Sequence, residues 1–121
     1  MSYHDGDVEL TSDPFEHRVL CPICRNDNLH QQAVGVYHNP FDSRREDSQG
    51  FLITPDGECM VHTRLYAGVL NPSERRDGIR ISFNCEHSCR VPDLLILQHK
   101  GTTYMSWDDE PSGSRLWPNE T

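Results

Sequence analysis

The sequence predicts a small all-β fold that is stabilised by a metal ion. Two cysteine pairs, Cys21 with Cys24 and Cys85 with Cys89, stand at either end of a series of short β-like runs. Leu, Ile, Val and Phe make up only 26 of the 121 residues, close to the fraction at which chains cannot form a core. A structural zinc ion contributes on the order of ten kcal/mol to folding, so the metal is expected to be part of the fold.

The two ends of the chain differ from its middle in charge. Residues 1–17 and 108–121 lack apolar periodicity and hold all of the net charge of −8, whereas residues 18–107 balance ten basic against ten acidic side chains. We therefore expect a flexible acidic arm (1–17), a zinc-ribbon β domain (18–107) and a flexible acidic tail (108–121).

The first strands follow the first cysteine pair. Leu29 to Tyr37 is rich in β-branched and aromatic residues and stops before an Asn-Pro, which predicts a strand. Phe51 to Thr54 predicts a short edge strand that ends at a Pro-Asp-Gly turn.

Cys59 to Leu65 alternates apolar and polar residues, a pattern typical of a half-buried strand. Cys59 then takes the inner face as a small apolar residue, with a substitute ligand or a redox thiol as alternatives.

Gly78 to Cys85 predicts the clearest strand, which also delivers a metal ligand. Alternation places Arg80 and Ser82 on the outer face and the apolar residues on the inner one. Further on, Leu94 to His99 and Thr102 to Trp107 flank Lys100-Gly101 and predict a hairpin. No segment shows a helical period.

The predicted metal ligands are Cys21, Cys24, Cys85 and Cys89. Each pair can approach one ion from a tight turn, and four thiolates in a tetrahedral set favour one structural zinc ion. The second pair has three intervening residues, so His87 is an alternative ligand beside Cys85. Absence of a physiological metal, with or without disulfides, is the remaining alternative. The paired turns on antiparallel strands define a zinc ribbon.

The pattern does not predict an enzyme. Catalytic zinc keeps an open position for water, whereas four cysteines fill the coordination shell. The His-x-Glu that precedes Pro-Cys-x-x-Cys in zinc deaminases is absent, since Glu16 comes before His17. His62 and His99 could face each other across the sheet as a second site.

Arginines raise the alternative of nucleic-acid binding. Arg75 and Arg76 stand in a loop near Arg80, but neighbouring acids interrupt the basic run. A nucleic-acid surface would need these arginines to converge with an exposed aromatic such as Tyr37 or Tyr66.

We expect a soluble, cytoplasmic protein. No apolar run approaches the roughly 18 residues that span a bilayer, and the start of the chain lacks the basic and apolar regions of a signal peptide. An odd number of cysteines, five, suits a reducing compartment better than a disulfide framework.

Several motifs together resemble a known group. Cys-Pro-x-Cys, Asn-Pro-Ser-x-Arg-Arg-Asp-Gly-x-Arg-Ile-x-Phe, Cys85 and Leu-x-Ile-x-Gln-His-Lys-Gly-x-Thr follow one another over residues 19–107. This order resembles small, largely uncharacterised zinc-ribbon proteins of bacteria and phages. The resemblance implies the fold and the metal, and a phage origin would imply host takeover or evasion of host defence.

Together these features predict a non-enzymatic zinc-ribbon adaptor that binds a protein partner through its sheet and loops. The acidic arms would steer a basic partner, more weakly at high salt. The alternative is a nucleic-acid-binding zinc ribbon whose acidic tails regulate access to the arginine loops.

Overall fold

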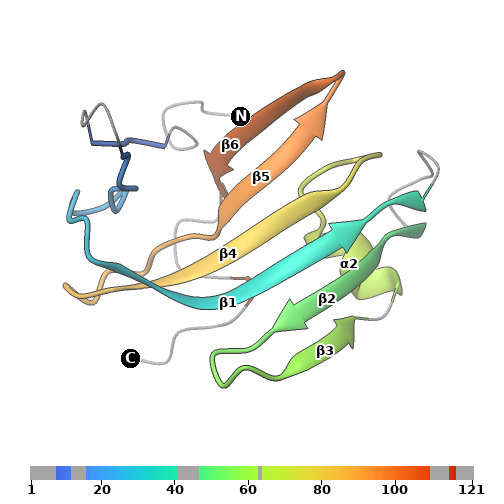
Figure 1. Ribbon diagram of the computed structural model, residues 1–121, viewed down its shortest axis with the longest axis horizontal. Coiled ribbons are helices and arrows are strands. Elements are labelled where there is room, and N and C mark those ends of the chain that lie inside the picture. The colour runs from blue at the N-terminus through green and yellow to red at the C-terminus, as the bar shows by residue number, and fades with distance from the viewer. Residues whose placement is uncertain (1–7, 12–15, 41–46, 63, 110–114, 117–121) are drawn as a thin grey trace.

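The chain forms one six-stranded antiparallel sheet with a short helix on one face (Figure 1). The computed structural model describes residues 8–11, 16–40, 47–62, 64–109 and 115–116. The elements are β1 (Leu29–His38), β2 (Gln49–Ile53), β3 (Cys59–His62), α2 (Arg64–Leu70), β4 (Gly78–Cys85), β5 (Leu94–His99) and β6 (Thr102–Trp107). The predicted all-β class, an antiparallel sheet with a cysteine cluster, is confirmed.

The strand order is β3-β2-β1-β4-β5-β6. Two three-stranded units, each built from consecutive strands, therefore join through the pairing of β1 with β4 in the middle of the sheet. The predicted hairpin between β5 and β6 is confirmed. Lys100 and Gly101 at its tip both have positive φ angles, 50° and 81°, as a two-residue hairpin turn requires.

One face of the sheet is covered by α2, which lies behind the sheet in Figure 1. The core on this side consists of Ala33, Tyr37, Leu52, Ala67, Leu70 and Leu116, which we call the helix-side core. Tyr37 is fully buried, and its ring lies against two glycines of the sheet. A Cβ at Gly50 would lie 2.8 Å from that ring and 3.0 Å from Ala67, so glycine is what allows the ring to pack there.

A second core lies at the metal end of the sheet. It consists of Cys21, Phe83, Cys85, Val91, Leu94 and Trp107, which we call the metal-end core. Val8 and Val19 of the N-terminal segment pack against it, and Leu10 forms a β-bridge with Val19. Part of the segment assigned to a flexible arm therefore contacts the domain.

The C-terminal segment also reaches the body of the protein. Asp108 and Leu116, which the sequence analysis placed in a flexible tail, are 5% and 4% exposed. Leu116 joins the helix-side core. Among the helices of the described residues, none is long and apolar enough to cross a membrane.

The strand predicted from Cys59 to Leu65 is present only over Cys59–His62, and it is mostly exposed rather than half-buried. The strand β3 ends at His62 and α2 begins at Arg64, so the prediction of no helix was wrong. A helix of 7 residues is too short to display a period, and packing of Ala67 and Leu70 in the helix-side core stabilises it. Cys59 is exposed on the edge strand rather than on an inner face.

The faces of β4 were assigned correctly only at the metal end, where Phe83 and Cys85 are buried as predicted. Arg80 and Ser82 are buried at 3% and 0% exposure, while Ile79 and Ile81 are only half-buried. Alternation fixes which residues share a face, but the cover on that face decides which side is the interior. Here α2 and the C-terminal residues cover the side that carries Arg80.

Candidate functional site

The first cysteine pair lies in a tight turn immediately before β1. The N–H of Arg25 donates to the carbonyl of Cys21 at 2.8 Å, and the N–H of Cys21 donates to the carbonyl of Asn26 at 2.9 Å. Arg25 adopts a left-handed conformation with φ of 64°. The N–H of Ile23 donates to the Cys21 sulfur at 3.4 Å. This turn directs both thiols to one side and places backbone N–H groups next to both sulfurs.

The second pair forms a related turn at the end of β4. The N–H of His87 donates to the Cys85 sulfur at 3.4 Å, and that of Ser88 donates to the Cys85 carbonyl at 2.9 Å. Ser88 has a φ of 61°. In the first turn the left-handed residue follows the second cysteine, whereas here it precedes Cys89. The left-handed conformation of Ser88 thus accommodates the longer spacing between Cys85 and Cys89.

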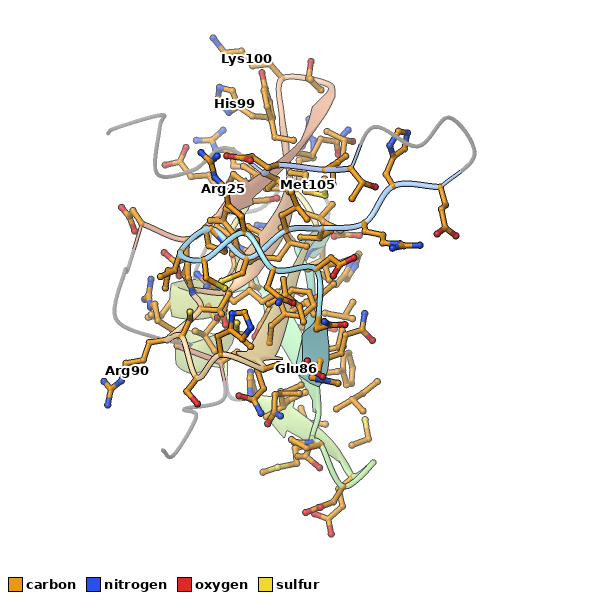
Figure 2. The ribbon with its side chains drawn as sticks, turned by 90° about the vertical axis from the view of Figure 1, so that its left-hand side faces the viewer. Arg25, Glu86, Arg90, His99, Lys100 and Met105 are labelled. Carbon is orange, nitrogen blue, oxygen red and sulfur yellow. The ribbon has the colours of Figure 1, made fainter. Side chains whose placement is uncertain are left out.

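Pairing of β1 with β4 brings the two turns together. Leu29, just after the first turn, is the register partner of Cys85, and the N–H of Glu86 donates to the carbonyl of Asn28 at 3.3 Å. Figure 2 looks onto this end of the sheet, where Arg25 and Glu86 flank the turns.

All four sulfurs of Cys21, Cys24, Cys85 and Cys89 lie within 4.8 Å of one another. Cys24 and Cys85 are 3.5 Å apart. A tetrahedral zinc site with bonds of about 2.3 Å has sulfurs about 3.8 Å apart, so the cluster fits such an ion. Cys21 and Cys85 are buried, Cys89 is partly buried and Cys24 is exposed. The four cysteines could therefore hold one metal ion at the edge of the metal-end core.

The surroundings of each thiol determine how strongly protons compete with a metal ion for its sulfur. The backbone N–H of Asn26 lowers the pKa of Cys24 to about 6. Burial raises the pKa of Cys89 to about 12 and raises that of Cys21 as well. A bound cation must displace the protons of Cys21 and Cys89 at neutral pH, so metal affinity should rise with pH.

His87 lies beside the cluster and is not a member of it. The side-chain amide of Asn26 donates to its Nε2 at 3.2 Å, and the residue is exposed. Its ring also acts on the neighbouring Cys24 thiol, whose pKa it helps to lower. The geometry brings Cys89, rather than His87, together with the other three cysteines.

The other cysteine and the histidines lie elsewhere. Cys59 lies on β3, where it is the register partner of Ile53 of β2. It is not in the cluster. His62 and His99 do not face each other, because β2, β1 and β4 separate the strands that carry them. His30 pairs with the carboxylate of Glu86 at 3.1 Å on the surface.

Arg80 forms a buried ionic cluster that sequence reasoning missed. Its Nη1 lies 3.1 Å from Asp93 and 2.6 Å from Asp108, and all three side chains are at most 4% exposed. Its Nε donates to the carbonyl of Leu70 at the end of α2. The N–H of Leu116 donates to Asp93 at 3.1 Å. Arg80 therefore connects the sheet with the helix and the C-terminal segment.

The sequence did carry a signal for this cluster. Asp93 precedes β5 and Asp108 follows β6, so antiparallel pairing of Leu94 with Trp107 places the two aspartates side by side. Burial acts to raise the pKa of Asp108, but the hydrogen bond and charge of Arg80 outweigh it and the net pKa is lowered. Two adjacent carboxylates require a cation, and β4 supplies it.

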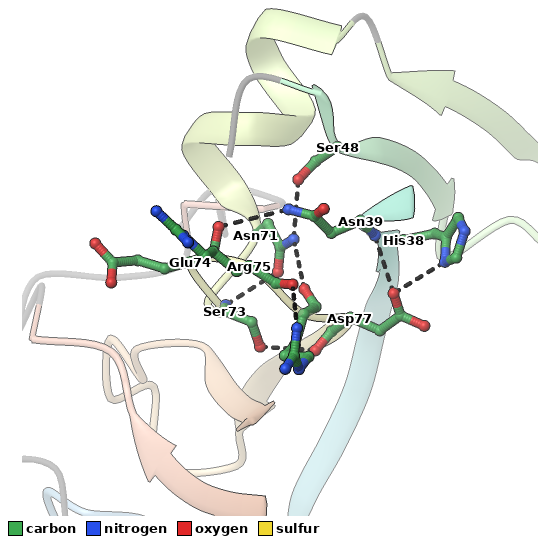
Figure 3. A network of polar contacts seen from close by, with 9 residues as sticks. His38, Asn39, Ser48, Asn71, Ser73, Glu74, Arg75 and Asp77 are labelled. Carbon is green, nitrogen blue, oxygen red and sulfur yellow. Dashed lines mark hydrogen bonds and ion pairs between the residues drawn. The ribbon is translucent and has the colours of Figure 1, made fainter. Parts of the chain in front are cut away.

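The loop from 71 to 77 presents Arg75 and Arg76 to solvent on a hydrogen-bonded frame (Figure 3). Asn71 donates to Ser48 at 3.0 Å and accepts from the N–H of Ser73 at 3.0 Å. Asp77 accepts from the ring of His38 at 2.9 Å. The frame fixes the loop to β1 and to the segment before β2.

The convergence required of a nucleic-acid surface is not found at this loop. Arg80 is buried, and so is Tyr37, one of the two aromatics considered as a stacking platform. The side chain of the other, Tyr66, lies outside the described residues, as do Arg44 and Arg45, a second arginine pair in the sequence that neighbouring acids also interrupt.

The face of the sheet opposite α2 is apolar, and away from the metal-end core no described segment covers it. One row of register partners crosses all six strands of this face, and we call it the open-face row. It consists of Val61, Phe51, Val36, Ile79, Ile96 and Met105. Val61 is 74% exposed, and Phe51, Val36 and Met105 are each 42% exposed. In Figure 2 the sheet is seen edge-on, with α2 on the side away from this face.

Comparisons of the chain with protein-family models, with curated proteins and with solved structures found no match. The metal cluster and the open face are therefore interpreted from their own chemistry.

Proposed function

We propose that this protein is a structural-zinc domain that acts without catalysis as a protein-interaction adaptor. The observation that carries the proposal is the four-cysteine cluster beside an open apolar face. The four cysteines could hold one metal ion, and four thiolates make a complete ligand set for structural zinc. The open face supplies a surface for a partner.

The composition of the cluster supports a structural ion rather than a reactive one. Four thiolates fill a tetrahedral zinc shell, whereas catalytic zinc retains a position for water. Cys21 and Cys85 are buried, and each receives a backbone hydrogen bond that would orient its sulfur toward the ion.

The open-face row supports a protein partner over a nucleic acid. None of its six residues is charged, and nucleic-acid affinity depends on cationic contacts with phosphates. Apolar patches of this extent on a small domain typically mark protein interaction sites. The expected partner therefore presents an uncharged, apolar surface of its own.

A pull-down at low salt, with the full-length, zinc-loaded chain as bait, tests the proposal. Val36→Lys places a charge in the middle of the open-face row, and Thr102→Lys makes the same kind of change on the opposite face of β6. The parent chain and Thr102→Lys should retain a partner protein that Val36→Lys loses. Failure to capture any protein, or salt-dependent binding of DNA or RNA that Val36→Lys leaves intact, would contradict the proposal.

A further inference from the structure

The open face continues beyond the open-face row. A second row of register partners runs beside it and consists of Cys59, Ile53, Val34, Ile81, Leu94 and Trp107. Leu94 and Trp107 at one end of this second row are buried in the metal-end core, whereas Ile53 is 46% exposed. The part of the face that the described residues leave uncovered therefore extends over β3, β2, β1 and β4 and along the open-face row to β6.

Neither row contains a charged residue, although the chain has a net charge of −8. Polar but uncharged Gln49, Gln98 and Thr103 border the open-face row, together with His38, which pairs with Asp77. That charge lies in residues 1–17 and 108–121, whereas residues 18–107 are neutral overall, so two of these uncharged faces can meet with little charge repulsion.

We propose that the occupant of the open face is a second copy of this chain, packed sheet to sheet about a twofold axis. The proposal rests on the proposed function, since it names the partner of the same face. A twofold contact uses one patch on both partners, so the patch must be complementary to itself. Apolar sheet faces meet that requirement, because two of them pack about 10 Å apart with their side chains interdigitated.

The chemistry of the face favours a copy of itself over an unrelated partner. Selection between unrelated partners uses charged or hydrogen-bonding groups that leave a wrong partner unsatisfied. The side chains of Val36, Phe51 and Ile79 offer none in the middle of the face. The face can therefore select a partner only by shape and apolar contact. The same face of an identical chain offers both.

The size of the face agrees with a dimer of moderate affinity. Strands about 4.8 Å apart and alternate residues about 6.7 Å apart give roughly 500 Å² for the uncovered rows and their polar border. A specific interface buries about 1,000 Å² or more over both partners, so the face reaches the lower limit. We expect a reversible dimer with a micromolar dissociation constant.

Sedimentation equilibrium of the full-length, zinc-loaded chain in reductant, over a wide range of protein concentration, tests the inference. The parent chain should dimerise. Val36→Lys and the more peripheral Val61→Lys should each raise the dissociation constant by about tenfold or more, since the contact would bury an unpaired charge in both copies. Thr102→Lys, on the other face, should leave the dissociation constant unchanged. Equal zinc content in all four proteins shows that the fold is retained.

Three results would overturn the inference. They are a monomer at every concentration, a dimer that both valine substitutions leave intact, and a dimer that disappears in reductant or in Cys59→Ser. The last would be a disulfide between exposed thiols of Cys59. A monomeric chain whose capture of another protein still depends on Val36 would overturn the dimer while leaving the adaptor function standing.

Discussion

Cys21 and Cys85 each receive a hydrogen bond from the backbone N–H two residues further along the chain. The two turns thus offer the same local support to thiolates of different pairs. A serine hydroxyl keeps the size of the side chain but does not replace a thiolate as a zinc ligand.

Cys21→Ser and Cys85→Ser should each abolish stoichiometric zinc binding and unfold the domain. The zinc contribution of about ten kcal/mol is comparable to the whole stability of a small domain. Zinc content and far-UV circular dichroism measure the two effects. Cys59→Ser is the matched control, because Cys59 is exposed and outside the cluster, and it should keep both zinc and fold.

The four cysteines were predictable as a set because their spacing in the sequence already restricts each pair to one turn. The conformation that brings Cys89 into the cluster was not predictable. It depends on a left-handed Ser88, and serine does not specify that conformation as glycine would. Arg80 was misplaced for another reason, since only the pairing of distant strands brings Asp93 and Asp108 to it.

Arg80→Met should destabilise the protein by about 3–5 kcal/mol, because it removes the buried cation of two carboxylates and leaves only the partly exposed Arg115, 3.7 Å from Asp108. Denaturant unfolding of the zinc-loaded protein measures the loss. Arg76→Met, in the exposed loop, should change stability by less than about 0.5 kcal/mol. Equal effects of the two substitutions would show that the Arg80 cluster contributes nothing specific.

At the scale of elements, strands were easier to predict than the helix. The strands β1, β4, β5 and β6 lie where composition and alternation place them. The helix α2 depends on tertiary contacts, since Ala67 and Leu70 pack in the helix-side core. The alternating residues before α2 do form a strand, β3. It lies at the edge of the sheet and pairs with β2 on one side only.

The contact between α2 and the sheet depends on Gly50. Gly50→Ala should destabilise the protein by about 1–3 kcal/mol, because the added methyl group would overlap the ring of Tyr37 and press on Ala67. Thermal unfolding measures the loss. Gly57→Asn is a suitable control, since a Cβ at Gly57 has open space around it and asparagine tolerates its φ of 85°. Equal unfolding temperatures for the two variants would contradict the proposed packing.

At the scale of the whole molecule, the cysteine cluster is placed where the two halves of the sheet join. One pair precedes β1 and the other begins at the last residue of β4, and these strands form the central pairing between the two three-stranded units. The cysteine cluster and the antiparallel strands were predictable from the sequence, but the strand order requires long-range pairing that local patterns do not encode. A metal ion at this position would hold both halves and compensate for a small core.

Removal of the metal tests this account most directly. The purified full-length chain should contain about one zinc ion, and a chelator under reducing conditions should unfold the whole sheet in a single transition that added zinc reverses. Zinc analysis together with circular dichroism during chelation gives both quantities. A chain that remains fully folded without metal would contradict the claim that the four-cysteine cluster is a structural centre.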